Sequence, residues 1–264
     1  MTTEVQAPAS ARRAQITERT LRTDNWWRYP LATAAVLIVV TAYLVYAVFA
    51  NGDYFWEPYI SPMYSPCLTG NCSPGSGWNW FGSIAPVTPA LIIILFPMGF
   101  RVTCYYYRKA YYRAFWASPP ACAVAEPHRR YTGETRFPLI MQNIHRYFWY
   151  VAVVFALILT YDVVISFRDH QGRWGHAGLG TLVLLVNVVL IWAYTLSCHS
   201  CRHITGGRLK HFSRHPLRYK TWTFISKLNA KHMQLAWASL VFIALTDLYI
   251  RLVAAGVITD PRFF

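Results

Sequence analysis

The segment SCHSCRHITGG, residues 197–207, concentrates soft metal ligands in a short stretch of the chain. Cys198 and Cys201 have the CxxC spacing that chelates zinc or iron–sulfur clusters. On a helix this spacing places the two thiols one turn apart on one face, with His199 and His203 together on an adjacent face. The pattern therefore predicts a metal site, with reduced structural cysteines beside solvated histidines as the alternative.

The elements that must position these ligands are long and apolar. Apolar residues make up 55% of the 264 residues, and charged residues only 14%. Five stretches reach the length of roughly 20 residues that a helix needs to cross a hydrocarbon core of about 30 Å. They comprise residues 29–50, 80–100, 147–167, 177–197 and 233–258. We therefore predict an all-α, polytopic integral membrane protein whose five transmembrane helices form a bundle.

The basic residues are distributed unevenly around these spans. If the spans alternate in direction, all but four of the 25 Lys and Arg residues fall on one side. That side comprises the arm 1–27 with Arg28 and the segments 101–146 and 198–232, whereas the loop 51–79 on the other side has none. Because cytoplasmic segments carry the excess of Lys and Arg, we expect the N-terminus inside and the C-terminus outside. No nucleic-acid-binding motif accompanies the charge, so we expect no nucleic-acid partner.

The outer loop 51–79 carries a separate pair of cysteines. Cys67 and Cys72 lie close together in the sequence, on the side that faces an oxidising compartment. Disulfides form and persist in such compartments. We therefore predict a disulfide between Cys67 and Cys72, with a free or ligating pair as the alternative.

Most of the other cysteines and histidines fall on the inner side, where three helix ends are expected to meet. The third span starts near His145 and the fifth starts near His232. The fourth span ends at Cys198 and Cys201. Ligands at one depth on neighbouring helices are what a shared metal site requires. The sequence therefore predicts one inner site that combines thiols and imidazoles.

Three kinds of metal centre fit parts of this inventory. Zinc binds Cys and His together and has no redox activity. A haem b would need two histidines at matched depth and no thiolate, and His145 with His203 or His232 would serve. A Rieske-type [2Fe–2S] cluster takes two Cys on one iron and two His on the other, which raises its potential from about −400 mV to roughly −150 to +300 mV. The inner residues match this last ligand set best, and such a potential suits an electron donor to quinone.

Four segments of the sequence resemble a known family. These segments are RVTCYYYRKAYYRAFW, SPPACAVAEP, RFPLIMQNIHRYF and SCHSCRHITGG. They resemble the single-chain membrane-anchor subunit of a bacterial succinate dehydrogenase, respiratory complex II, of the kind common in actinobacteria, and the likeness covers residues 25–255. The resemblance implies five helices in the bacterial cytoplasmic membrane, a flavoprotein and an iron–sulfur subunit docked on the inner side, and a Rieske-type cluster in place of haem. It is also compatible with a higher oligomer of the complex.

The resemblance does not identify the ligands, so we assign them from the predicted geometry. The candidates are two thiolates for the first iron and two imidazoles for the second, namely Cys198, Cys201, His145 and His232. His203 is the substitute imidazole. Cys104, just past the second span, and Cys122, in the following loop, are rival thiolates.

A quinone site needs a flat apolar slot and one or two donors to the carbonyl oxygens. The candidates at the inner interface are Arg101, Tyr105, Tyr106, Arg146 and Tyr147. Tyrosine and arginine also anchor helices at membrane boundaries, which is the alternative for each of these residues. The basic inner segments could hold lipid headgroups or dock the partner subunits.

The sequence therefore favours the quinone-reducing membrane subunit of a succinate dehydrogenase, which passes electrons from the partner iron–sulfur subunit through an inner Rieske-type centre to quinone. One alternative is an anchor of the same complex with haem b. Another is a membrane protein without redox chemistry, a transporter or an assembly factor, with CHSC as a structural zinc or thiol site. Asp162 and Asp247 are intramembrane carboxylates and hence functional candidates, although Asp247 could form an ion pair with Arg251 one turn later.

Overall fold

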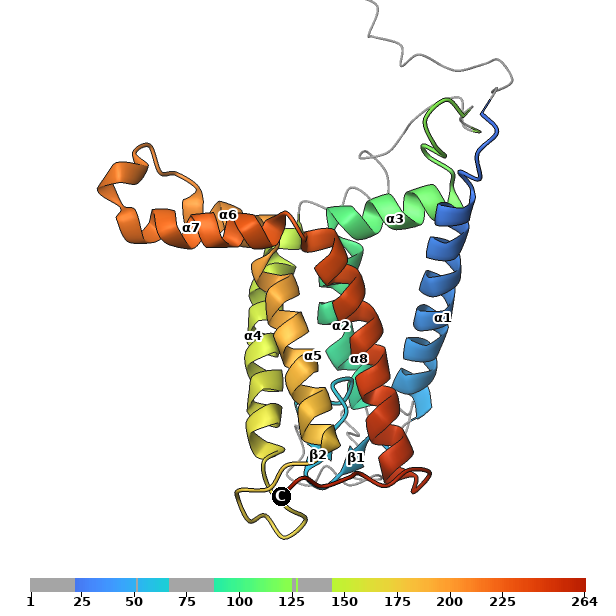
Figure 1. Cartoon of the computed structure of the whole chain (residues 1–264), viewed down its shortest axis with the longest axis vertical. Helices are drawn as coiled ribbons and strands as arrows, with labels where there is room; N and C mark the ends of the chain where they lie inside the picture. Colours follow the sequence, from blue (N-terminus) through green and yellow to red (C-terminus); the bar gives the residue numbers. More distant parts are fainter. Residues whose placement is uncertain (1–21, 51, 67–87, 125–126, 128–143) are drawn as a thin grey trace, which may run out of the picture.

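The fold is a bundle of long helices with shorter helices across one end (Figure 1). The structure is a computed structural model that describes residues 22–50, 52–66, 88–124, 127 and 144–264. The long helices are α1 (Arg28–Ala50), α2 (Pro89–Val102), α4 (His145–Ile165), α5 (Leu179–Leu196) and α8 (His232–Ala254). Each overlaps one of the predicted apolar stretches. Cys67 and Cys72, with their predicted disulfide, lie outside the described residues.

The long helices have the length and composition of membrane spans. The helices α1, α4, α5 and α8 each pass as apolar spans of at least 18 residues. The helix α2 is long and apolar enough for a span only when it is taken together with α3 (Tyr105–Phe115), from which it is bent by 80°. Large apolar side chains such as Ile38, Val39 and Phe49 are exposed along α1, as expected where hydrocarbon is the solvent. These observations confirm an all-α, polytopic membrane protein.

The bundle is held together by close helix crossings. The helix α5 packs between α4 and α8, and α2 packs on α4. At the crossing of α2 and α4, Gly99 lies so near Phe148 that a Cβ on the glycine would overlap the ring. Small residues permit such close approach in membrane bundles, where van der Waals packing drives association. This contact fixes how the C-terminal end of α2 lies relative to the start of α4.

One end of the bundle is covered by α3, α6 (His199–Gly206) and α7 (Pro216–Asn229), which lie across the long helices (Figure 1). The described residues that precede α1 lie at the same end. Gly206 lies against Trp222 of α7, so α6 and α7 are tightly packed. The described parts of the basic segments 101–146 and 198–232 thus meet at one end of the molecule.

The opposite end carries a small hairpin and the C-terminal tail. Strands β1 (Phe55–Trp56) and β2 (Tyr59–Ile60) pair antiparallel. The Tyr59 hydroxyl donates a hydrogen bond to Asp260 Oδ2 at 2.8 Å, and the backbone N–H of Gly180 donates to Asp260 Oδ1 at 2.7 Å. The tail therefore joins the hairpin to the start of α5.

A buried ion pair lies within the bundle near this second end. Arg251 Nε donates to Asp247 Oδ2 at 2.8 Å, which confirms the predicted pair on α8. Tyr43 of α1 donates to Asp247 at 2.6 Å, and the Ser61 hydroxyl donates to the other carboxylate oxygen. Arg251 also donates to the carbonyl oxygen of Gly52 at 2.6 Å. The network ties α8 to α1 and to the segment 52–66.

Asp162 has a partner in the same segment. Its carboxylate accepts a hydrogen bond from the hydroxyl of Ser65, which is fully buried. Both intramembrane carboxylates thus attach the segment 52–66 to the bundle, which gives each of them a structural role.

Candidate metal centre

Two of the long helices end in the same way, with a hydroxyl residue followed by a cysteine. Thr103 and Cys104 lie between α2 and α3, and Ser197 and Cys198 lie between α5 and α6. Both cysteines have an extended backbone, with ψ of 131° and 144°, and each is the N-cap of the following helix. The chain therefore leaves the direction of the span at each cysteine, and both thiols lie at the junction of a long helix with a crossing helix.

Two other long helices begin with a histidine at this end of the bundle. His145 is the first residue of α4, and His232 is the first residue of α8. The site is largely removed from solvent, because Cys104 is 2% exposed and Cys198 and His232 are each 1% exposed, whereas His145 is half-buried. Four helix termini therefore bring two thiols and two imidazoles into one buried region.

The His145 ring is held between the two junctions. Its Nε2 atom lies 3.1 Å from Sγ of Cys198, and its Nδ1 atom lies 2.8 Å from Oγ1 of Thr103. One face of the ring stacks on Phe100, with the ring centroids 4.8 Å apart and the planes within 8°. The ring orientation is thus fixed, with Nε2 directed at the thiol.

The His232 ring is also held between the two junctions, with the sources of the thiol and the hydroxyl exchanged. Its Nε2 atom lies 3.5 Å from Sγ of Cys104, and its Nδ1 atom lies 2.7 Å from Oγ of Ser197. The ring stacks on Tyr194 at 5.1 Å and meets the edge of Tyr106 at 5.2 Å. Each histidine therefore contacts a thiol from one junction and a hydroxyl from the other.

The four side chains lie as two pairs rather than as a closed ligand set. Among the described residues, no three Cys, His or acidic side chains converge closely enough to hold one metal ion. Burial raises the pKa of the Cys198 thiol to about 12, although the backbone N–H of Ser200 donates to its sulfur. The free thiol is therefore protonated at neutral pH, and binding of a metal would release its proton.

The structure places the two thiols of the CxxC pair in different surroundings, because only that of Cys198 contacts a histidine. Cys201 is buried on α6 and its thiol interacts with Thr205, whereas Cys104 is the second thiol that contacts a histidine. The CxxC spacing places both thiols on one face only if the helix is continuous, but the backbone is extended at Cys198 and α6 starts only after it. Burial also raises the pKa of the Cys201 thiol.

His203 and Cys122, the other predicted ligands, are both exposed. His203 is exposed on α6 and lines a hollow on the surface. Cys122 is exposed beyond α3, where its backbone carbonyl accepts a hydrogen bond from Arg22 at 2.7 Å.

Arg101, the first predicted quinone ligand, is packed among neighbouring helices. Its Nη1 atom donates to Tyr107 Oη at 2.6 Å and to Ser239 Oγ at 3.2 Å. The guanidinium carbon lies 4.8 Å from the centre of the Tyr194 ring, which also stacks on His232. Arg101 is therefore a cation close to the Cys–His pairs rather than a side chain that faces an open slot.

The remaining quinone candidates do not gather around one slot. Tyr147 is 69% exposed on α4 and Tyr105 is 53% exposed on α3. Arg146 lines the same surface hollow as His203. Tyr106 lies inside, against the His232 ring.

A cavity of about 170 Å³ adjoins the site at Tyr106, between α1, α3 and the start of α8. Its lining is mostly aromatic and basic and comprises Tyr29, Pro30, Thr33, Tyr106, Lys109, Ala110, Arg113, Met233 and Trp237. Because Tyr106 contacts both the cavity and the His232 ring, one side chain separates this space from the imidazole.

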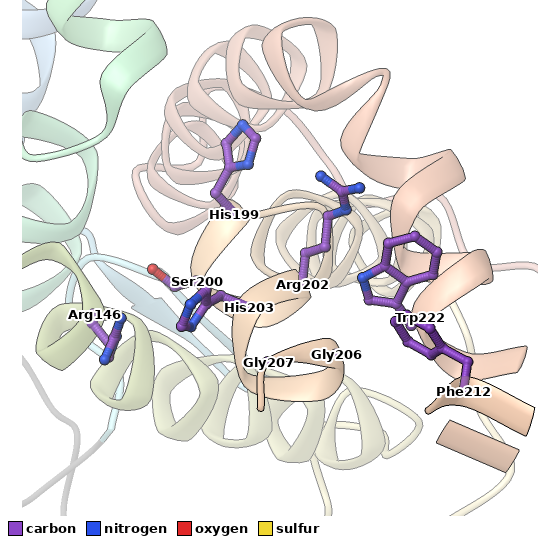
Figure 2. A pocket seen from close by; sticks show the side chains of 9 residues that line it. All are labelled: Arg146, His199, Ser200, Arg202, His203, Gly206, Gly207, Phe212 and Trp222. Carbon is purple, nitrogen blue, oxygen red and sulfur yellow. The ribbon is translucent and has the colours of Figure 1, made fainter. Parts of the chain in front are cut away.

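A larger hollow, of about 470 Å³, lies on the surface beside α6. Figure 2 shows the side chains that line it. Its lining includes Arg146, His199, Arg202 and His203, together with Trp222 of α7. Arg202 points toward Trp222, with its guanidinium 5.0 Å from the ring centre. Burial and the charge of Arg202 lower the pKa of His199. The hollow is a basic surface that does not include the paired thiols.

Thr103 and Ser197 are site residues that the sequence prediction missed. The signal that could have found them is the repeated dipeptide, Thr-Cys at 103–104 and Ser-Cys at 197–198, which directly follows an apolar span both times.

An apolar helical bundle with two thiols and two imidazoles gathered at one end defines a polytopic membrane protein with a candidate metal centre. The family model for the actinobacterial succinate dehydrogenase subunit SdhC matches residues 28–256, and the chain belongs to this family. A chain of the Mycobacterium smegmatis Sdh1 complex in the apo form is 54% identical, with a TM-score of 0.83 over 97% of this chain and 98% of that chain. No curated protein sequence matches. The predicted resemblance to the membrane anchor of a bacterial succinate dehydrogenase is confirmed.

Proposed function

We propose that this subunit holds a Rieske-type [2Fe–2S] cluster on Cys104, Cys198, His145 and His232 and reduces membrane quinone. The observation that supports the proposal is the meeting of two thiols and two imidazole Nε2 atoms at four helix ends. Two cysteines and two histidines are the ligand set of such clusters. When bound, the cluster would supply one-electron transfer at a potential raised by its histidine ligands.

The surroundings of the four proposed ligands suit a [2Fe–2S] cluster in two respects. Each imidazole has its second ring nitrogen bound to a hydroxyl, as histidines that ligate metals have a partner on the nitrogen that does not bind. Each cysteine is the N-cap residue of a helix, where the helix dipole would favour the thiolate that forms when a metal displaces the thiol proton. At Cys198 the N–H of Ser200 lies 3.4 Å from the sulfur.

Arg101 would favour the reduced state of the centre. Its guanidinium lies over Tyr194, which stacks on His232, so a positive charge is held one aromatic ring away from a proposed ligand. Hydrogen bonds to Tyr107 and Ser239 keep it there. A fixed cation stabilises an added electron, and solvent exclusion strengthens the effect.

We place the quinone headgroup in the cavity beside Tyr106. The cavity combines aromatic walls with donors to carbonyl oxygens, as quinone recognition requires, and Tyr29 and Lys109 are the donors we favour. Its volume suits a ring headgroup, and Tyr106 connects it to His232. This assignment retains Tyr106 of the five residues predicted from the sequence.

The crossing helices α3, α6 and α7 would form the surface on which the flavoprotein and iron–sulfur subunits dock. They collect the described parts of the basic segments at one end of the bundle, and the bias of basic residues would make that end cytoplasmic. The related chain belongs to the Sdh1 complex, which supports the same partnership here. The location would be the bacterial cytoplasmic membrane.

The test is a measurement on the purified complex of iron, acid-labile sulfide and the EPR spectrum of the reduced state. We expect iron and sulfide beyond the share of the partner subunits. Cys104→Ser and Cys198→Ser should each remove the additional EPR signal, whereas the matched variants Cys201→Ser and Cys122→Ser should keep it. A Soret band without the additional sulfide would support the haem alternative, and zinc without either would support a structural site.

A further inference from the structure

The hydroxyls of Thr103 and Ser197 have their protons committed to the backbone. Thr103 Oγ1 donates to the carbonyl oxygen of Gly99 at 2.7 Å, and Ser197 Oγ donates to that of Tyr194 at 2.8 Å. A hydroxyl has a single proton to donate but two lone pairs with which to accept. Toward a histidine, each of these hydroxyls can therefore act only as an acceptor.

These hydrogen bonds determine the tautomer of both histidines. Since the hydroxyls accept, the ring atoms that face them, Nδ1 of His145 and Nδ1 of His232, must carry protons. In a neutral imidazole the other nitrogen then presents a lone pair. In both rings that atom is Nε2, which faces a cysteine sulfur.

We propose that Thr103 and Ser197 are positioning residues that fix both histidines as Nδ1–H tautomers and direct their Nε2 lone pairs to the metal centre. The inference rests on the proposed function, because it names the residues that prepare the imidazoles to bind the cluster. It also explains the exchanged geometry, in which each junction gives a thiol to one histidine and a hydroxyl to the other. A shift of either junction would therefore disturb ligands on both sides of the centre.

The choice of a hydroxyl has a chemical consequence. A carboxylate partner on Nδ1–H would add a negative charge and make the imidazole a stronger donor, which would lower the reduction potential of the centre. A neutral hydroxyl orients the ring without that charge. Thr103 and Ser197 are thus suited to a centre of relatively high potential.

Variants of the intact complex test the roles of the two hydroxyls. Thr103→Val and Ser197→Ala should each lower the spin count of the membrane EPR signal, change its nitrogen hyperfine coupling and reduce quinone turnover by about 10–100-fold. Thr103→Ser keeps the hydroxyl, so its spin count, nitrogen hyperfine coupling and quinone turnover should stay near the wild-type values. Matched controls are Thr246→Val and Ser166→Ala, because these hydroxyls donate in the same way to the carbonyls of Phe242 and Val163. Unchanged EPR in both test variants would overturn the inference.

A second measurement requires no substitution. The wild-type complex is labelled with histidine carrying ¹⁵N at Nε2 alone or at Nδ1 alone, and the reduced state is examined by pulsed EPR. The strong coupling should come from Nε2, and the Nδ1 label should give only a weak, remote coupling. Strong coupling from Nδ1 would overturn the inference while leaving the cluster in place. The absence of any additional cluster signal would instead overturn the proposed function, and the inference with it.

Discussion

Nε2 of His145 lies 3.1 Å from Sγ of Cys198, although the two residues are 53 positions apart in the sequence. The two residues flank an antiparallel pair of spans, since α4 starts at His145 and α5 ends just before Ser197. The two helices carry the chain away from this end of the bundle and back. They therefore return Cys198 to the level of His145. This arrangement makes the separation of thiol and imidazole dependent on the packing of α4 against α5.

Removal of either imidazole should separate the two half-reactions of the complex. In His145→Ala and His232→Ala, quinone reduction should be lost, whereas succinate oxidation with artificial acceptors should continue because its chemistry lies on the partner subunits. The measurement is a pair of steady-state assays on the same preparation. His203→Ala is the control, since His203 is exposed on α6, and should behave as wild type. Normal quinone turnover in either test variant would exclude that histidine as a ligand.

A larger side chain in the cavity beside Tyr106 should hinder quinone without affecting the metal centre. Ala110 on α3 lines the cavity, and Ala110→Leu would occupy part of its volume of about 170 Å³. We expect the KM for quinone to rise about tenfold or more, on the scale of 1–3 kcal/mol that a methylene-sized change in a pocket is worth.

Ala114→Leu is the matched control, because it makes the same change one turn later on α3, at a residue that does not line the cavity. Its KM should stay near the wild-type value, and the EPR signal should be unchanged in both variants. An equal rise of KM in both would place the quinone elsewhere.

The long helices could be predicted from the sequence because the membrane imposes a simple rule of length and polarity. The histidines could be predicted for the same reason, since His145 and His232 each start a span and so lie at one depth. These inferences need no knowledge of how the helices cross. They depend only on where each helix enters the hydrocarbon layer.

Which two thiols contact the imidazoles could not be predicted in this way, because that depends on where the chain turns. The spacing of Cys198 and Cys201 indicates a shared face only if both residues are helical, and Cys198 is extended. Cys104 reaches the site because α3 bends by 80° away from α2 at this position. A bend of that kind arises from tertiary packing and leaves little trace in the pattern of apolar residues.

Loss of the carboxylate of Asp247 should destabilise the bundle strongly. Asp247→Asn would leave Arg251 buried without its counter-charge, and removal of one partner from a buried pair costs about 3–5 kcal/mol. The control is Asp169→Asn, which removes an ion pair to Arg173, a side chain that is 68% exposed, and should have a much smaller effect. Thermal unfolding of the detergent-solubilised complex, followed by tryptophan fluorescence, measures both. Equal midpoints would show that the buried pair is not needed for stability.

A methyl group at Gly99 should disturb the metal centre through the packing of two helices. In Gly99→Ala the new Cβ would overlap the ring of Phe148, so α2 and α4 would have to move apart, at a cost of about 1–3 kcal/mol. Because α2 leads into Thr103 and α4 starts at His145, this shift should also lengthen the contact between Oγ1 and Nδ1 and broaden the EPR signal of the centre. Gly52→Ala is the control, since its Cβ would meet only a backbone oxygen at 3.6 Å, an ordinary contact. A lower unfolding midpoint with an unchanged EPR spectrum would show that the site tolerates movement of α2, and that the crossing at Gly99 does not position it.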